Sequence, residues 1–311
     1  MRNPISIWSA CVFVFTPVFA AAPARGADLH LVVFADTLDP AIATDVDMSN
    51  AVSWGQTIAG YTGLTLRFQS LSGELLTATR GRTVLHALSP GSDDVVYFIY
   101  SGHGGNAGDS EWPTFTLLTG SYLDFDEVVG ILQPKSQRLL VVIADCCNAT
   151  LSSGRMAPEF DVAQNALTVM NFQNLFLNFR GTVLVSSSAQ GQYSLGDTLE
   201  GGLFLNAYMD TFRQMAGVVS GLTWQDVLAA ASAETQQLAA QYGELQQPQY
   251  VVSTEQVAAG TPAEPASTAG GTTGSDDATT GGAGTTAAPM CGPMSAFPLL
   301  AVFGLALLRR R

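Results

Sequence analysis

The sequence predicts an α/β fold with a doubly wound, mostly parallel sheet and helices on both of its faces. Two very apolar segments, residues 95–100 and 139–144, are rich in β-branched and aromatic residues and do not alternate with polar ones. Central strands have this pattern when both faces of a parallel sheet are covered. Segments with helical spacing alternate with strand-like segments over residues 29–253, which is the order typical of a layered α/β domain.

The first half of this region predicts three strands and three helices. The segment from Asp36 to Pro40 ends the first strand, and His30 within that strand is expected to be structural. We expect Gly105–Gly120 to form a loop. The expected strands are 29–34, 64–68 and 95–100, and the expected helices are 48–60, 77–88 and 124–132.

The second half predicts three strands and two helices. Thr223 and Asp226 resemble a capping box at the start of the second helix. Apolar and aromatic residues on one face indicate that the first helix, which Gly201 and Gly202 open, packs against the core. The expected strands are 139–147, 181–188 and 248–253, and the expected helices begin near residues 203 and 224.

The termini predict export. Residues 1–27 have a basic start, an apolar stretch and small residues, as in a secretory signal peptide, and an uncleaved membrane anchor is the alternative. Residues 28–256 form the folded domain, and 257–290 are a Gly/Thr/Ala/Ser/Pro-rich stalk. Residues 291–311 combine a short apolar run with three final arginines, which resembles bacterial sorting signals, and a simple tail anchor is the alternative. We expect a membrane-anchored surface protein, or one secreted after C-terminal processing.

Charge and cysteine content exclude several functions. The net charge is −13 and Lys135 is the only lysine, which argues against binding to nucleic acid or anionic lipid. After residue 27 the only cysteines are Cys146, Cys147 and Cys291. Three cysteines, two of them adjacent, do not form a disulfide framework.

The two apolar strands each end in reactive side chains. The first is followed by Ser101-Gly-His103-Gly104-Gly105, and the second by Asp145-Cys146-Cys147. Ligands bind at the carboxyl ends of parallel strands, so a thiol and an imidazole are expected to meet there as nucleophile and base. The alternatives are a glycine-rich turn with an incidental histidine and a buried, inert cysteine.

Tyr100-Ser-Gly-His-Gly104 and Asp145-Cys-Cys147 resemble the histidine and cysteine boxes of the caspase/metacaspase cysteine peptidases. Gly202–Tyr208 and Gln247–Tyr250 resemble later features of that family, so the resemblance covers about residues 29–253. It implies a caspase-like fold, with His103 as catalytic histidine and Cys147 as nucleophile, because the family pattern is Asp-x-Cys. The N–H groups of Gly104 and Cys147 would form the oxyanion hole.

The resemblance also implies a substrate preference. Asp145 matches a metacaspase aspartate that lines the pocket for a basic side chain, and either Asp45 or Asp47 would add a second carboxylate. The chain departs from the family after the cysteine, where Asn148-Ala-Thr replaces the usual His-Ser-Gly. No third residue that orients His103 is identified. Calcium activates some relatives, but no calcium loop is recognisable, and we expect no cofactor or metal.

We therefore expect an exported cysteine endopeptidase that cleaves protein or peptide substrates after Arg or Lys. A catalytically idle caspase-like module used for binding is one alternative. A transpeptidase with the same catalytic residues is another.

Overall fold

The computed structural model describes residues 26–39, 42–106, 110–147, 165–197 and 199–257. The expected signal peptide up to residue 25, the stalk from residue 258 onward and the segment 291–311 lie outside these residues. None of the helices in the described part of the chain is both long and apolar enough to cross a membrane.

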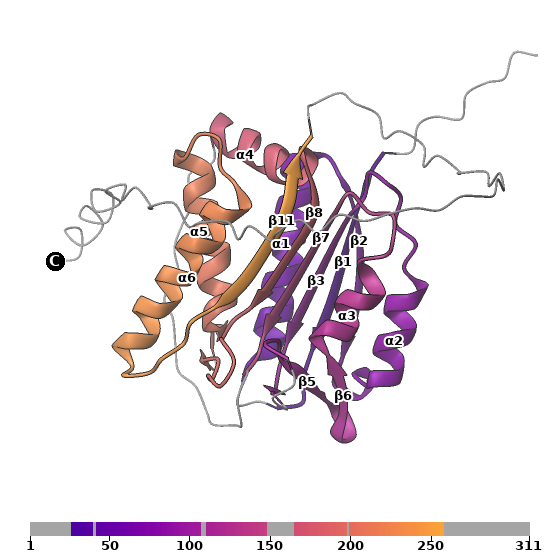
Figure 1. Ribbon diagram of the computed structural model, residues 1–311, viewed down its shortest axis with the longest axis vertical. Coiled ribbons are helices and arrows are strands. Elements are labelled where there is room, and N and C mark those ends of the chain that lie inside the picture. The colour runs from indigo at the N-terminus through magenta and orange to yellow at the C-terminus, as the bar shows by residue number, and fades with distance from the viewer. Residues whose placement is uncertain (1–25, 40–41, 107–109, 148–164, 198, 258–311) are drawn as a thin grey trace, which may run out of the picture. The chain divides into compact units, whose positions relative to one another are not determined.

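A six-stranded sheet forms the centre of the domain, in the order β11-β8-β7-β3-β1-β2 (Figure 1). All neighbouring strands are parallel except β11, which is antiparallel to β8. The expected mostly parallel sheet is therefore confirmed. Its strands are β1 (Asp28–Ala35), β2 (Thr65–Ser72), β3 (Val95–Ser101), β7 (Leu139–Asp145), β8 (Phe179–Ser186) and β11 (Gln249–Gln256).

Helices cover both faces of this sheet, and each face has its own hydrophobic core. Every residue of β3 and β7 is buried, because these central strands contribute alternate side chains to the two cores. One face carries α1 (Thr44–Thr62), α4 (Ala166–Leu177), α5 (Leu203–Val218) and α6 (Trp224–Gln241), and the other carries α2 (Ala78–Ala87) and α3 (Phe125–Leu132).

Local sequence signals set several helix ends. The Thr223 hydroxyl accepts the N–H of Asp226, whose carboxylate accepts the N–H of Thr223, so the predicted capping box is confirmed. The hydroxyl of Thr77 caps α2 in a similar way by accepting the N–H of Arg80. Helix α1 ends at Gly63, whose φ of 76° is left-handed and favours glycine.

The expected loop at 105–120 is wrong. This region contains the middle strand of a small antiparallel sheet and a short 3-10 helix, and the strands of that sheet are only two to four residues long. Alternation over so few residues is too short to distinguish a strand from a loop. The elements are β4 (Gly104–Gly105), β5 (Thr114–Leu117), the 3-10 helix Leu118–Gly120 and β6 (Ser121–Asp124).

Helix α4 and several short elements, among them the 3-10 helix Gly73–Leu75, were also not predicted from the sequence. Helix α4 begins after Asn165, whose side chain accepts the N–H of Thr168. Asn165 followed by an apolar run was the available signal for that helix. The other short elements include the two-residue strands β9 (Gly196–Asp197) and β10 (Gly201–Gly202), which pair with each other.

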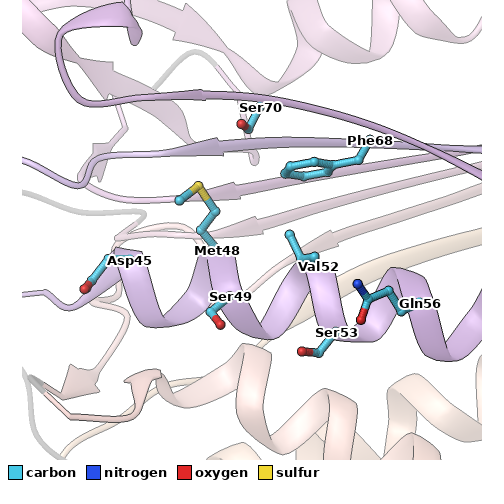
Figure 2. A pocket seen from close by; sticks show the side chains of 8 residues that line it. All are labelled: Asp45, Met48, Ser49, Val52, Ser53, Gln56, Phe68 and Ser70. Carbon is cyan, nitrogen blue, oxygen red and sulfur yellow. The ribbon is translucent and has the colours of Figure 1, made fainter.

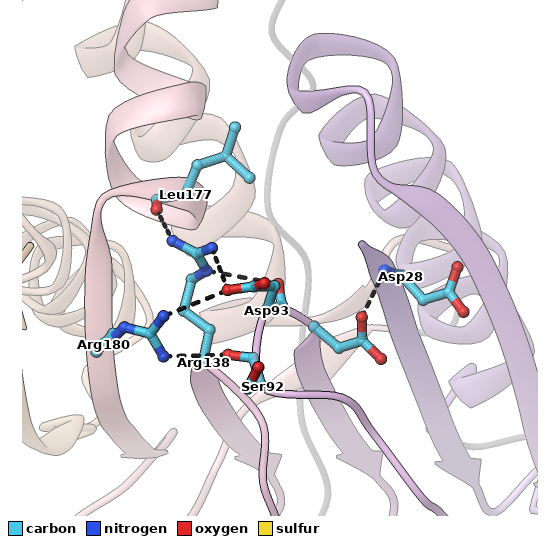
Figure 3. Close-up of polar contacts among 7 residues, drawn as sticks. Asp28, Ser92, Asp93, Arg138, Leu177 and Arg180 are labelled. Carbon is cyan, nitrogen blue, oxygen red and sulfur yellow. Dashed lines mark hydrogen bonds and ion pairs between the residues drawn. The ribbon is translucent and has the colours of Figure 1, made fainter. Parts of the chain in front are cut away.

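Ionic contacts close the amino end of the central strands (Figure 3). Asp93 accepts hydrogen bonds from Arg138 at 2.8 Å and from Arg180 at 3.3 Å. Arg138 also donates to the carbonyl of Leu177 at the end of α4. Beside this network, the ring of His30 lies 3.0 Å from a carboxylate oxygen of Asp94. At this end of the sheet, these contacts join neighbouring elements of the domain to one another.

Candidate active site

The register of β3 and β7 brings His103 and Cys147 to the same level of the sheet. Ser101 pairs with Asp145, and each of the two candidate residues follows two positions later. The N–H of Gly102 still donates to the carbonyl of Asp145, at 3.2 Å, beyond the last paired residues. The predicted imidazole and thiol therefore follow adjacent parallel strands at their carboxyl edge.

The backbone of His103 is held by the small sheet. Its carbonyl accepts hydrogen bonds from the Tyr100 hydroxyl at 2.6 Å and from the Thr116 N–H at 2.9 Å. Tyr100 in turn stacks on Phe115, with ring centroids 4.1 Å apart. The small sheet, which was not predicted from the sequence, therefore holds the backbone of His103, which the sequence analysis had singled out.

The imidazole of His103 has a carboxylate partner. Its Nε2 lies 2.7 Å from Oδ2 of Asp39, in the loop that follows β1. Asp39 could not be identified from the sequence, because it lies 64 residues from His103 and belongs to no recognised motif.

The two adjacent cysteines have different surroundings. Cys146 is 2% exposed and belongs to the core beneath α2 and α3, whereas Cys147 is 8% exposed and lies outside both large core clusters. The thiol of Cys147 donates to the carbonyl of Ser194 at 3.7 Å. Burial raises the pKa of Cys147, and the charge of Asp145 raises it further. Both effects disfavour the thiolate form of Cys147.

Gly104 lies directly against the cysteine pair. A β-carbon at this position would lie 2.5 Å from the carbonyl oxygen of Cys147 and 2.6 Å from Sγ of Cys146. No side chain fits there without displacing the backbone that carries the thiol. The glycine predicted for the oxyanion hole is thus in contact with the predicted nucleophile.

Two buried carboxylates, Asp47 and Asp145, lie next to these residues. Asp145 accepts hydrogen bonds from the Ser194 hydroxyl at 2.7 Å and from the N–H of Leu205 at 2.9 Å. Asp47 accepts from the Ser101 hydroxyl and from the N–H of Gly202 at 2.8 Å. We call Asp47 and Asp145 the carboxylate pair.

The strand β10 covers both members of the carboxylate pair. A β-carbon on Gly201 would come within 2.1 Å of Oδ1 of Asp47, and one on Gly202 within 2.2 Å of Oδ2 of Asp145. Burial, and then the negative charge of Asp145, raise the pKa of Asp47 to about 7. Burial also raises the pKa of Asp145. The two carboxylates thus repel each other in a site that excludes water.

Asp45 is not part of this pair. It is exposed in the first turn of α1 and lines a groove of about 340 Å³ between α1 and β2 (Figure 2). Of the two candidates for a second pocket carboxylate, the structure therefore brings only Asp47 to Asp145.

A buried glutamine supports the segment behind Cys147. The side chain of Gln246 donates to the carbonyl of Ser187 at 2.9 Å and to the hydroxyl of Ser194 at 3.1 Å, and accepts the N–H of Leu195 at 2.8 Å. Ser194 contacts both Cys147 and Asp145. Sequence reasoning missed Gln246, although it directly precedes the Gln247–Tyr250 motif.

Within the described residues, Asp28, His30 and Asp94 have ligand atoms that all lie within 4.8 Å of one another, as a metal site requires. This cluster lies at the amino end of the sheet, away from His103. The guanidinium of Arg67 contacts Asp28 at 3.2 Å, and Asp94 accepts the N–H groups of Asp28 and Gly91. These contacts give both carboxylates partners within the protein, and the structural role expected for His30 stays a prediction.

A parallel α/β sheet with an imidazole and a thiol at the ends of adjacent strands defines the class of α/β cysteine hydrolases. The family described as "Caspase domain" matches residues 62–258, which include His103, Cys147 and Asp145. The chain belongs to the caspase family of cysteine peptidases, and the expected caspase-like fold is confirmed. The matched range begins after most of α1, so Asp39 and Asp47 lie outside it. The comparison with curated proteins found no match.

Proposed function

We propose that this chain is an active cysteine endopeptidase that cleaves after Arg or Lys. The observation that carries the preference is the buried carboxylate pair beside Cys147. Among the described residues, no Lys or Arg lies within ion-pair distance of either carboxylate. A buried charge without a counter-ion is costly, so a basic substrate side chain would supply what the site lacks.

The carboxylate pair can accept further hydrogen bonds from such a ligand. A carboxylate offers about four lone-pair sites, and protein groups use two on Asp47 and two or three on Asp145. A guanidinium with several donors is suited to bridge the two carboxylates, and an acidic side chain would be repelled. Because β10 lies against both carboxylates, substrate binding requires the Gly201–Gly202 segment to shift.

The proposed chemistry uses His103 and Cys147. His103 removes the thiol proton as Sγ attacks the peptide carbonyl, and the imidazolium then protonates the leaving amine. The N–H groups of Gly104 and Cys147 stabilise the oxyanion. Water, activated by His103, hydrolyses the acyl-enzyme. A basic substrate side chain beside Asp145 would also weaken the negative charge that disfavours the Cys147 thiolate.

The test compares two fluorogenic peptides that differ only in Arg or Asp before the cleavage site. We expect the wild-type protein to cleave the arginine peptide. Asp145→Asn should lower its kcat/KM by roughly two orders of magnitude or more, because breaking a buried charge pair costs about 3–5 kcal/mol. Asp45→Asn removes the same charge at an exposed position of α1 and is the matched control.

Preference for the aspartate peptide, or an equal effect of the two variants, would contradict the proposed specificity. Product masses distinguish hydrolysis from transfer to an added amine. Labelling by an active-site thiol probe distinguishes an enzyme from a binding module.

A further inference from the structure

The contact between His103 and Asp39 joins two loops at the carboxyl edge of the sheet. The His103 Nε2 to Asp39 Oδ2 distance of 2.7 Å is typical of a charge-assisted hydrogen bond. The side chains are 27% and 35% exposed, so each is partly shielded but open to solvent on one side.

The loop that carries Asp39 is fixed at both ends. At its start, the N–H of Asp36 donates to the carbonyl of Ser101 at 3.0 Å, which ties it to the strand leading to His103. At its end, the hydroxyl of Thr44 donates to the carbonyl of Asp36 at 2.6 Å. Asp39 therefore reaches His103 from a loop bonded to the strand that carries the histidine.

The contact with Asp39 determines which ring nitrogen of His103 can accept a proton. A neutral imidazole has one N–H donor and one nitrogen with a lone pair. A carboxylate only accepts, so Nε2 carries the hydrogen that it donates to Asp39. The lone pair is then on Nδ1, which leaves Nδ1 as the ring atom that can accept a proton from the thiol.

We propose that Asp39 is a positioning residue that fixes the orientation and tautomer of His103, so that Nδ1 exchanges protons with Cys147 and the substrate. This inference rests on the proposed peptidase function. In the first step the S–H bond breaks, its proton moves to Nδ1, and Sγ bonds to the carbonyl carbon. The carbonyl electron pair moves to oxygen.

The later steps return the proton. The oxyanion collapses, the C–N bond breaks, and Nδ1–H protonates the amine that leaves. Nδ1 then takes a proton from water, whose oxygen attacks the acyl carbon and displaces the thiolate, which recovers the proton. Asp39 stays ionised throughout and balances the charge of the imidazolium at each stage.

The experiment uses the full-length protein with Asp39→Asn and Asp39→Glu, and with Asp45→Asn as a control for charge. For Asp39→Asn we expect kcat on the arginine peptide to fall about 10- to 100-fold, because general acid–base catalysis of this kind contributes at least that much. KM should stay within about two-fold, since the proposed role of Asp39 is to orient His103 and not to bind the substrate side chain. Asp39→Glu should recover part of kcat, and Asp45→Asn should match the wild type.

Alkylation of Cys147 by iodoacetamide, followed by mass spectrometry, gives a second readout that needs no substrate. We expect it to slow in Asp39→Asn in parallel with kcat, with no change in Tm, because a partly exposed ion pair adds little to folding. Unchanged kcat and alkylation in Asp39→Asn would overturn the inference. A loss that is matched by a lower Tm and not restored by glutamate would also overturn it.

The two proposals fail in different ways. If the wild-type protein cleaves no peptide but its alkylation depends on Asp39, the proposed function fails and the positioning role stands. If the wild-type protein cleaves the arginine peptide and Asp39→Asn does so equally well, only the positioning role fails.

Discussion

Cys146 and Cys147 have different surroundings because successive side chains at the end of a strand point to opposite faces of the sheet. Cys146 packs into the core with α2 and α3, where burial raises its pKa well above the usual range. Cys147 is more exposed, lies outside both large core clusters and donates to the carbonyl of Ser194. The sequence reduces the candidate nucleophiles to these two cysteines. The packing around each cysteine then distinguishes one from the other.

We expect Cys147→Ala to abolish turnover and Cys146→Ala to lower it only modestly. In the proposed mechanism Cys147 supplies the atom that forms the acyl-enzyme, whereas Cys146→Ala removes only buried contacts. Cleavage of the arginine peptide and the Tm of both variants are the measurements. Full activity of Cys147→Ala combined with an inactive, folded Cys146→Ala would show that the two roles are reversed.

At the scale of elements, the short strand β4 brings the chain that follows His103 close to Cys146 and Cys147. Gly104 pairs with Phe115 of β5 while its Cα faces Cys146 and Cys147. The small sheet thus joins the histidine loop to the cysteine loop through one residue without a side chain. A strand of two residues is too short to have a recognisable sequence pattern.

Gly104→Ala should lower kcat/KM by about 10-fold or more, because its β-carbon would displace backbone that carries the thiol, and small displacements in an active site have large kinetic effects. The matched control is Gly130→Ala in α3, where a β-carbon meets nothing within 4 Å. That variant should keep its activity and gain roughly 0.5–1 kcal/mol, since alanine favours a helix. Equal activity of the two variants would argue against a catalytic contact at Gly104.

At the scale of the whole domain, Asp47 connects elements that are distant in the sequence. It lies in α1, accepts hydrogen bonds from β3 and β10, and faces Asp145 at the end of β7. Its pKa is raised to about 7 in the folded protein, from an ordinary value near 3.8. Between these values the folded state holds a proton that the unfolded state has lost, so stability falls as pH rises from about 4 to 7.

Asp47→Asn should therefore raise the Tm at pH 8 relative to the wild type, and this difference should disappear near pH 4. The new amide can accept the N–H of Gly202 and donate to Ser101, and it carries no charge. Thermal denaturation across this pH range is the measurement. Asp45→Asn, in the same helical turn but exposed, should show no such dependence. A lower Tm for Asp47→Asn at every pH would mean that the ionised carboxylate stabilises the fold.

The sequence by itself determined the α/β class, the central strands and the position of His103 and Cys147 at the carboxyl ends of two of those strands. These follow from local information, because fully buried strands are continuously apolar and motifs at their ends converge on one edge. The capping box of α6 and the glycine that ends α1 were also predictable from residues that are close together in the sequence. Only the tertiary structure decided between Asp45 and Asp47, brought Asp39 to His103 and placed Gln246 behind Ser194. Each of those contacts joins segments tens of residues apart, and their partners follow no periodic pattern.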